Sequence, residues 1–264
     1  MNTSMNTSFY GNNKRSYVQN QRILRLYSDF LYEDVGVHTE YQRRKSNIDF
    51  LEKYNFSSCL IYNTLRRNVS NICRIIRLFA VGNTNIIKNP FSYNGFQLIE
   101  MCHKGYKLNC AGCSIVLNDI LITLGYKSKC ICCVPYETDD INTHVVVHVC
   151  DDTNNKWFVA DPAMGRVPCD RKGNSMDILT LREYLSEENE MPFYRSGKII
   201  LNDAECREYA EELIDKVFMF VVFQNSGLNY DFKSTKIIIP EGIKHISSMY
   251  NVSEKTNNTF SMYN

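Results

Sequence analysis

One histidine and one aspartate lie at the ends of two neighbouring strand-like segments, where they could move a proton together. His144 begins a valine-rich run, and Asp161 follows the next such run. The turn-forming sequence Asp151–Asn155 separates the runs and predicts an antiparallel hairpin. If the chain reverses between Asp152 and Thr153, His144 and Asp161 are direct cross-strand neighbours, with Cβ atoms about 4.5–5.5 Å apart. The carboxylate could then accept a hydrogen bond from the imidazole; the alternative is an ordinary polar strand end beside a turn.

A cysteine at the expected start of a helix could be the nucleophile. Cys110 precedes the run 111–124, in which apolar residues recur at helical spacing, and Gly125 follows it as a typical helix-ending residue. Backbone N–H groups and the helix dipole stabilise an anion at that position and lower the pKa of a thiol. Most of the eleven cysteines are expected to be buried, unreactive apolar side chains. Cys110, His144 and Asp161 would form a thiol–imidazole–carboxylate set for acyl transfer.

Four motifs, in this order, resemble the transglutaminase-like core domain. They are Asn109-Cys110-Ala111-Gly112-x-Ser114, Leu124-Gly125-Tyr126-Lys127-x-Lys129, His144-Val-Val-Val-His148-Val149 and Trp157-x-x-x-Asp161-Pro162. Residues 170–182 are similar to a segment that follows in bacterial members, so the resemblance spans about residues 95–185. It implies that Cys110 is the nucleophile, His144 the base and Asp161 the group that orients the imidazole. It also implies a papain-like α+β fold, in which the cysteine-bearing helix packs on an antiparallel sheet.

The chain departs from that family pattern at several positions. Family members often carry an acid four residues after the histidine, where this chain has His148, which we expect to be a packed core residue opposite Trp157. The basic residue after the helix end is usually Arg and is Lys129 here. The sequence does not decide which side chain would complete the oxyanion hole, since Asn94 and Gln97 are both available upstream.

A different chemistry is open to the same helix start. Cys110 and Cys113 form a C-x-x-C motif, which is how thioredoxin-like thiol–disulfide oxidoreductases are built. Against this alternative, no clear strand leads into the motif, no Trp precedes it, and the pair His144 and Asp161 would have no role. Cys113→Ala separates the two hypotheses, because it abolishes dithiol exchange but spares a Cys–His–Asp enzyme.

A zinc site and a non-catalytic binding scaffold are the remaining alternatives. Cys110, Cys113, His144, His148 and the cysteines within 130–133 offer thiol and imidazole ligands. The long gap between Cys113 and His144 does not fit a compact zinc module, so we expect no metal and no cofactor. A scaffold that only binds would not need a complete triad.

The surrounding sequence predicts an α+β protein with a helical N-terminal region. Residues 1–16 and 251–264 are rich in Asn, Ser and Thr and lack apolar periodicity, so we expect disordered tails. Apolar residues at helical spacing predict a helical accessory region over 17–90. The catalytic core would cover 91–250, where the central helix precedes an antiparallel sheet.

Composition indicates a folded chain without bulk attraction to nucleic acid. Of the 264 residues, 44% are hydrophobic, and 30 Lys and Arg stand against 29 Asp and Glu. This balance removes the general electrostatic attraction to nucleic acids and anionic membranes. No run approaches the roughly 20 apolar residues of a membrane span, and the polar start of the chain has no signal-peptide pattern. We therefore expect a cytoplasmic protein with mostly reduced cysteines.

Together these patterns predict a cysteine-dependent acyl-transfer enzyme. The Cys110 thiolate would attack an amide carbonyl and form a thioester with loss of the amine. Water as the acceptor would make the protein a peptidase or amidohydrolase, whereas an amine would make it a transglutaminase or another acyltransferase. We expect hydrolysis, by a bacterial-type member, of a peptide, a protein or a small amide.

Overall fold

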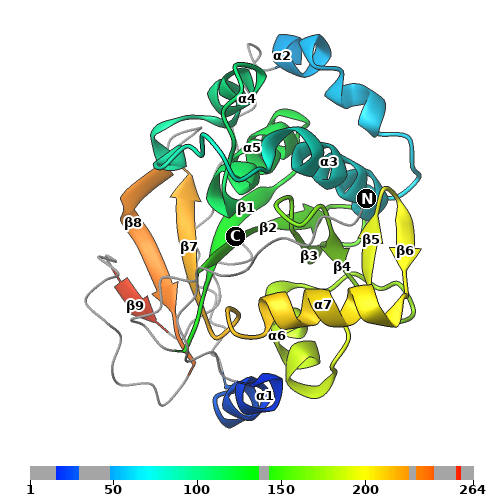
Figure 1. Cartoon of the computed structure of the whole chain (residues 1–264), viewed down its shortest axis with the longest axis vertical. Coiled ribbons are helices and arrows are strands. Elements are labelled where there is room, and N and C mark those ends of the chain that lie inside the picture. Colours follow the sequence, from blue (N-terminus) through cyan, green and yellow to red (C-terminus); the bar gives the residue numbers. More distant parts are fainter. Residues whose placement is uncertain (1–15, 30–47, 137–142, 226–229, 241–253, 257–264) are drawn as a thin grey trace.

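The computed structural model describes most of the chain and has an α+β architecture (Figure 1). The described residues are 16–29, 48–136, 143–225, 230–240 and 254–256. The expected tails lie almost wholly outside them. The few tail residues that the structure describes belong to regular elements. Ser16 caps the first helix, and Glu254–Thr256 forms a short strand, β9. In these ranges no helix is both long and apolar enough to cross a membrane.

The largest sheet of the described residues has the strand order β3-β2-β1-β7-β8-β9 (Figure 1). Its other strands are β1 (Ser128–Val134), β2 (His144–Asp151), β3 (Lys156–Ala160), β7 (Met219–Asn225) and β8 (Tyr230–Ile238). Neighbours are antiparallel except for the β8–β9 pair, which is parallel. Strand β1 is buried along its whole length, and β2 is buried except at its two ends. Their runs of Cys and Val fit this position, since a strand covered on both faces needs no polar alternation.

Helix α5 (Cys110–Thr123) packs on β1 and β2 (Figure 1). It begins at Cys110 because the Asn109 side chain caps it and accepts a hydrogen bond from the Gly112 N–H at 3.0 Å. It ends just before Gly125, whose φ of +91° suits the left-handed turn that closes a helix. Residues 111–121 are all buried, so α5 is the central helix of the fold.

The described residues before α5 form a helical region that shares its core with the sheet. Its helices are α1 (Tyr17–Leu26), α2 (Ile48–Lys53), α3 (Leu65–Ala80) and α4 (Gly95–His103), with short 3₁₀ turns at η2 (Phe56–Cys59) and η3 (Pro90–Ser92). The inner face of α3 carries Val69, Ile72 and Ile76, which are fully buried in the same hydrophobic cluster as α5. The Gly95 N–H donates to Asp119 of α5 at 2.7 Å, which joins α4 to the central helix.

A second layer of elements follows β3. It consists of β4 (Val167–Pro168), α6 (Ile178–Glu187), β5 (Phe193–Arg195), β6 (Lys198–Ile200) and α7 (Asp203–Leu213), and β4, β5 and β6 form a small antiparallel sheet. Helix α1 packs on α6, where buried Arg182 donates to the Leu24 carbonyl at 3.2 Å. Helix α7 reaches the end of β3, because the hydroxyl of its Tyr209 lies 3.4 Å from Oδ2 of Asp161.

The β2–β3 hairpin pairs in a register that differs from the expected one. Asp151 pairs with Lys156, so four residues form the loop, and Asn155 adopts a left-handed φ of +51° that helps to close it. Asp161 therefore lies just beyond the pair Val147–Ala160 and is not directly opposite His144. The shift keeps both side chains on one face, where diagonal neighbours remain within reach of long side chains.

Candidate active site

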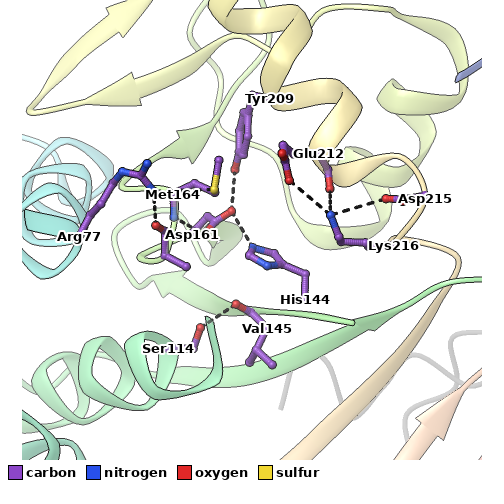
Figure 2. Close-up of polar contacts among 11 residues, drawn as sticks. Arg77, Ser114, His144, Val145, Asp161, Met164, Tyr209, Glu212, Asp215 and Lys216 are labelled. Carbon is purple, nitrogen blue, oxygen red and sulfur yellow. Dashed lines mark hydrogen bonds and ion pairs between the residues drawn. The ribbon is translucent and has the colours of Figure 1, made fainter. Parts of the chain in front are cut away.

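The first turn of α5 is fixed on the start of β2, and this contact brings Cys110 to His144. The Ser114 hydroxyl, one helical turn after Cys110, donates to the Val145 carbonyl at 2.8 Å (Figure 2). His144 and the Val145 backbone lie close enough to the Cys110 thiol to act on it, and both lower its pKa. The expected meeting of a helix-start thiol and a strand-start imidazole is therefore present.

His144 is also hydrogen-bonded to Asp161, although the two residues are diagonal neighbours. Nε2 of His144 lies 2.9 Å from Oδ2 of Asp161 (Figure 2). The side chain of Asp161 is fully buried, and that of His144 is 12% exposed. An ionised carboxylate can only accept, so Nε2 carries the hydrogen and Nδ1 is the nitrogen left to face the thiol. Cys110, His144 and Asp161 thus form one interacting series, in which His144 lowers the pKa of the thiol and is hydrogen-bonded to the carboxylate.

The Asp161 carboxylate is held by groups that the sequence did not single out. The Met164 N–H donates to Oδ1 at 3.0 Å, and the buried Tyr209 hydroxyl of α7 donates to Oδ2 at 3.4 Å (Figure 2). The backbones of Asp161 and Arg166 exchange two hydrogen bonds of 2.8 and 2.9 Å, which closes the turn after β3. Both carboxylate oxygens therefore have fixed partners besides His144.

Helix α3 supports the same turn from the other side. Arg77 donates to the Ala163 carbonyl at 2.5 Å (Figure 2). Gly165, with a φ of +69°, passes so close to α3 that a Cβ there would lie 2.9 Å from the Arg77 side chain. The N-terminal helical region therefore contributes to the placement of Asp161.

Electrostatic coupling within the series favours a charged pair. Burial acts to raise the pKa of the Cys110 thiol, but the hydrogen bond and charge of His144 and the Val145 backbone outweigh it and lower that pKa. Burial acts to lower the pKa of His144, but the charge and hydrogen bond of Asp161, together with Cys110, raise it to about 10. The charge of His144 in turn lowers the pKa of Asp161 against the effect of burial. The coupling therefore shifts the three groups toward thiolate, imidazolium and carboxylate.

The neighbouring cysteines have the opposite character. Burial raises the pKa of the Cys113 and Cys133 thiols well above the usual range, and it raises the pKa of Cys132 to about 12. These side chains are buried small apolar groups in the core. The helix-start cysteine is therefore the one that this cluster prepares for nucleophilic chemistry.

The other polar residues that the sequence singled out pack in the core or cap a helix. His148 is fully buried with its ring 5.0 Å from that of Trp157, although its cross-strand partner is Val159 and not Trp157 as expected. Asn94 and Gln97 bond each other's backbone N–H groups at 2.9 and 3.0 Å in a capping box at the start of α4. The capping box gives both side chains a local role and does not point to the oxyanion hole.

Two further observations bear on identity. No protein-family model, no curated protein and no solved structure matches this chain. Over the described ranges, no group of three His, Cys, Asp and Glu side chains gathers in a way that could hold a metal ion. The motifs and the geometry of the series are therefore the features of this chain that indicate a function.

Tyr209 provides a first test of that geometry. We expect Tyr209→Phe to loosen Asp161 and hence His144, so that the pH midpoint for alkylation of Cys110 rises by about half a unit to one unit. The ring contact with Phe193, with centroids 5.4 Å apart, should be kept. The rate of iodoacetamide reaction as a function of pH measures the shift.

The matched control for this test is Tyr194→Phe. The Tyr194 hydroxyl is also buried, but it donates to the Gly173 carbonyl at 2.8 Å, away from the series. Its loss should lower the melting temperature and leave the Cys110 midpoint in place. Equal midpoints in both variants and in the wild-type protein would show that Tyr209 does not position Asp161.

Proposed function

We propose that the protein is a cysteine-dependent acyl-transfer enzyme of the transglutaminase-like type, acting as a peptidase or amidohydrolase. The observation that carries the proposal is the series from the Cys110 thiol, whose pKa His144 lowers, through His144 to its hydrogen-bonded partner Asp161. The surroundings lower the pKa of the Cys110 thiol and of the Asp161 carboxyl group, which favours the thiolate and the carboxylate that acyl transfer needs.

The arrangement of elements supports a papain-like core for this enzyme. The nucleophile begins a buried central helix, the histidine begins an adjacent antiparallel strand, and the aspartate follows the next strand along the chain. The order Cys110, His144, Asp161 and the packing of α5 on β1 and β2 agree with the motifs from which the resemblance was drawn.

The proposed reaction proceeds through a thioester. The Cys110 thiolate attacks the amide carbonyl, and the negative charge moves to the carbonyl oxygen, near the backbone N–H at the start of α5. The tetrahedral intermediate then collapses, the C–N bond breaks, and the His144 imidazolium gives its proton to the leaving amine. A water molecule, deprotonated by the now neutral His144, attacks the thioester, and the acid and the Cys110 thiolate are released. Asp161 holds the imidazole in one tautomer throughout.

The dithiol alternative is less well supported by the surroundings of its second thiol. Cys113 is fully buried, and burial raises its pKa, so an external disulfide would not reach it without opening the core. Transfer of the acyl group to an amine would use the same series as hydrolysis. The experiment below therefore separates the two acceptors.

A panel of peptide and small-amide substrates, with and without an added primary amine, tests the proposal. We expect release of an amine from at least one substrate by the wild-type protein and none by Cys110→Ala. Incorporation of the added amine into the product would assign an acyltransferase and not a hydrolase. Equal turnover by the wild-type protein and Cys110→Ala would contradict the proposal.

A further inference from the structure

The proposed acyl transfer uses only one half of the C-x-x-C motif at the start of α5. Cys110 is the first residue of the helix and Cys113 follows three positions later. On a helix, Cβ atoms three residues apart lie about 5–6 Å from one another, whereas the Cβ atoms of a disulfide lie about 3.5–4.5 Å apart. The helix therefore holds the two cysteines close to disulfide distance, and a small adjustment of its first turn together with a side-chain rotation closes the remaining gap.

The two thiols differ sharply in reactivity. Cys110 is partly exposed and its thiolate is favoured by His144, whereas Cys113 is fully buried and its thiol stays protonated. Peroxides react with thiolates that solvent can reach and form a sulfenic acid. Oxidation should therefore begin at Cys110, and Cys113 is the thiol one helical turn away that can react next.

We propose that Cys110 is a reversible oxidation site for hydrogen peroxide and that Cys113 is its resolving cysteine. In the first step the Cys110 thiolate attacks one peroxide oxygen, the O–O bond breaks, and the products are the sulfenic acid and, after protonation, water. In the second step the Cys113 sulfur attacks the Cys110 sulfur, the S–O bond breaks, and a second water molecule leaves with the Cys113 proton. A dithiol reductant reverses the change, because it reduces the Cys110–Cys113 disulfide to two thiols and is itself oxidised to a disulfide.

The final oxidation product depends on whether Cys113 reacts with the Cys110 sulfenic acid. An unresolved sulfenic acid proceeds to a sulfinic acid, which thiols do not reduce. A disulfide to Cys113 stops oxidation at a reversible stage and removes the thiolate from His144. The part of the inference that concerns loss of acyl transfer rests on the proposed function, whereas the disulfide itself does not.

Cys132 of β1 is the competing partner. It pairs across the sheet with Val145, whose backbone lowers the pKa of the Cys110 thiol, and it is 7% exposed. Its position relative to Cys110 is set by packing between a helix and a sheet, whereas the spacing of Cys113 is set by the helix. Cys132→Ser is therefore the matched control for Cys113→Ser.

The test uses the native protein treated with hydrogen peroxide, then denatured, alkylated and digested with trypsin. Cleavage at Lys107 and Lys127 leaves Cys110 and Cys113 in one peptide, 108–127, and places Cys132 in another. We expect the oxidised wild-type peptide to take up no alkyl group and to weigh two hydrogen atoms less than the dithiol. Dithiothreitol should restore both alkylation sites, and Cys132→Ser should behave like the wild-type protein.

Cys113→Ser should change the product. We expect no disulfide in this variant, trapping of a Cys110 sulfenic acid by dimedone, and about tenfold more Cys110 sulfinic acid at equal peroxide. If the variant does not fold, the wild-type peptide map alone decides the pairing. A disulfide from Cys110 to Cys132, or direct passage of wild-type Cys110 to the sulfinic acid, would overturn the inference. A reversible 110–113 disulfide in a protein that turns over no amide would uphold it while the proposed function fails.

Discussion

Replacing His144 by alanine should reduce acyl transfer about 10⁴- to 10⁶-fold. The imidazole of His144 lowers the pKa of Cys110, and without it burial, which acts to raise that pKa, is opposed only by the Val145 backbone among the groups that act on the thiol. The leaving amine would also lose its proton donor. The ratio of kcat/KM for the wild-type protein and the variant, on a substrate found with the amide panel, measures the loss.

His148 supplies the control for this result. It lies on the same strand and the same face as His144, but it packs against Trp157 inside the core. His148→Ala should lower the free energy of unfolding by about 2–5 kcal/mol because it leaves a void, and it should spare the reactivity of Cys110. An essential His148 together with a replaceable His144 would mean that the wrong histidine has been assigned.

Replacing Asp161 by asparagine should lower the rate of acyl transfer about 10²- to 10⁴-fold while the fold is kept. The amide is nearly isosteric with the carboxylate, but it lacks the charge that raises the pKa of His144 to about 10. The pKa of His144 should therefore fall, and the thiolate–imidazolium pair should persist over a narrower pH range. The amide can also donate to Nε2, which favours the wrong imidazole tautomer.

Two comparisons make the Asp161 result specific. Asp119→Asn changes another buried aspartate, one that accepts the Gly95 N–H, and it should affect stability but not the pH dependence of Cys110. In a His144→Ala background, Asp161→Asn should cost little more, because the two residues act as a unit. If the rate loss of the double variant equals the product of the two single-variant losses, Asp161 does not act through His144.

Local sequence signals were enough to predict the members of the series. The Asn109 cap and the apolar face after it place Cys110 at a helix start, and the valine run places His144 at a strand start. The register of the hairpin was predicted wrongly because its loop has four residues and depends on the left-handed conformation of Asn155. His144 and Asp161 still meet, since the error left both on one face.

The partners of Asp161 could not be predicted in the same way. Tyr209 is 48 residues further along the chain, and only the tertiary fold brings its hydroxyl to the carboxylate. Two helix starts, in contrast, have a local signal in the sequence. Asn94-x-x-Gln97 has the spacing of a capping box, and Asp177 precedes a helical pattern that forms α6.

Selective alkylation tests the central claim, that Cys110 is the activated thiol of this protein, most directly. At about pH 6.5 an ordinary cysteine is only about 1% thiolate, whereas Cys110 should react well because its pKa is lowered. Iodoacetamide labelling followed by peptide mapping should find the label first on Cys110 in the wild-type protein, and this preference should be lost in His144→Ala. Labelling of Cys132 or Cys133 ahead of Cys110 would contradict the account.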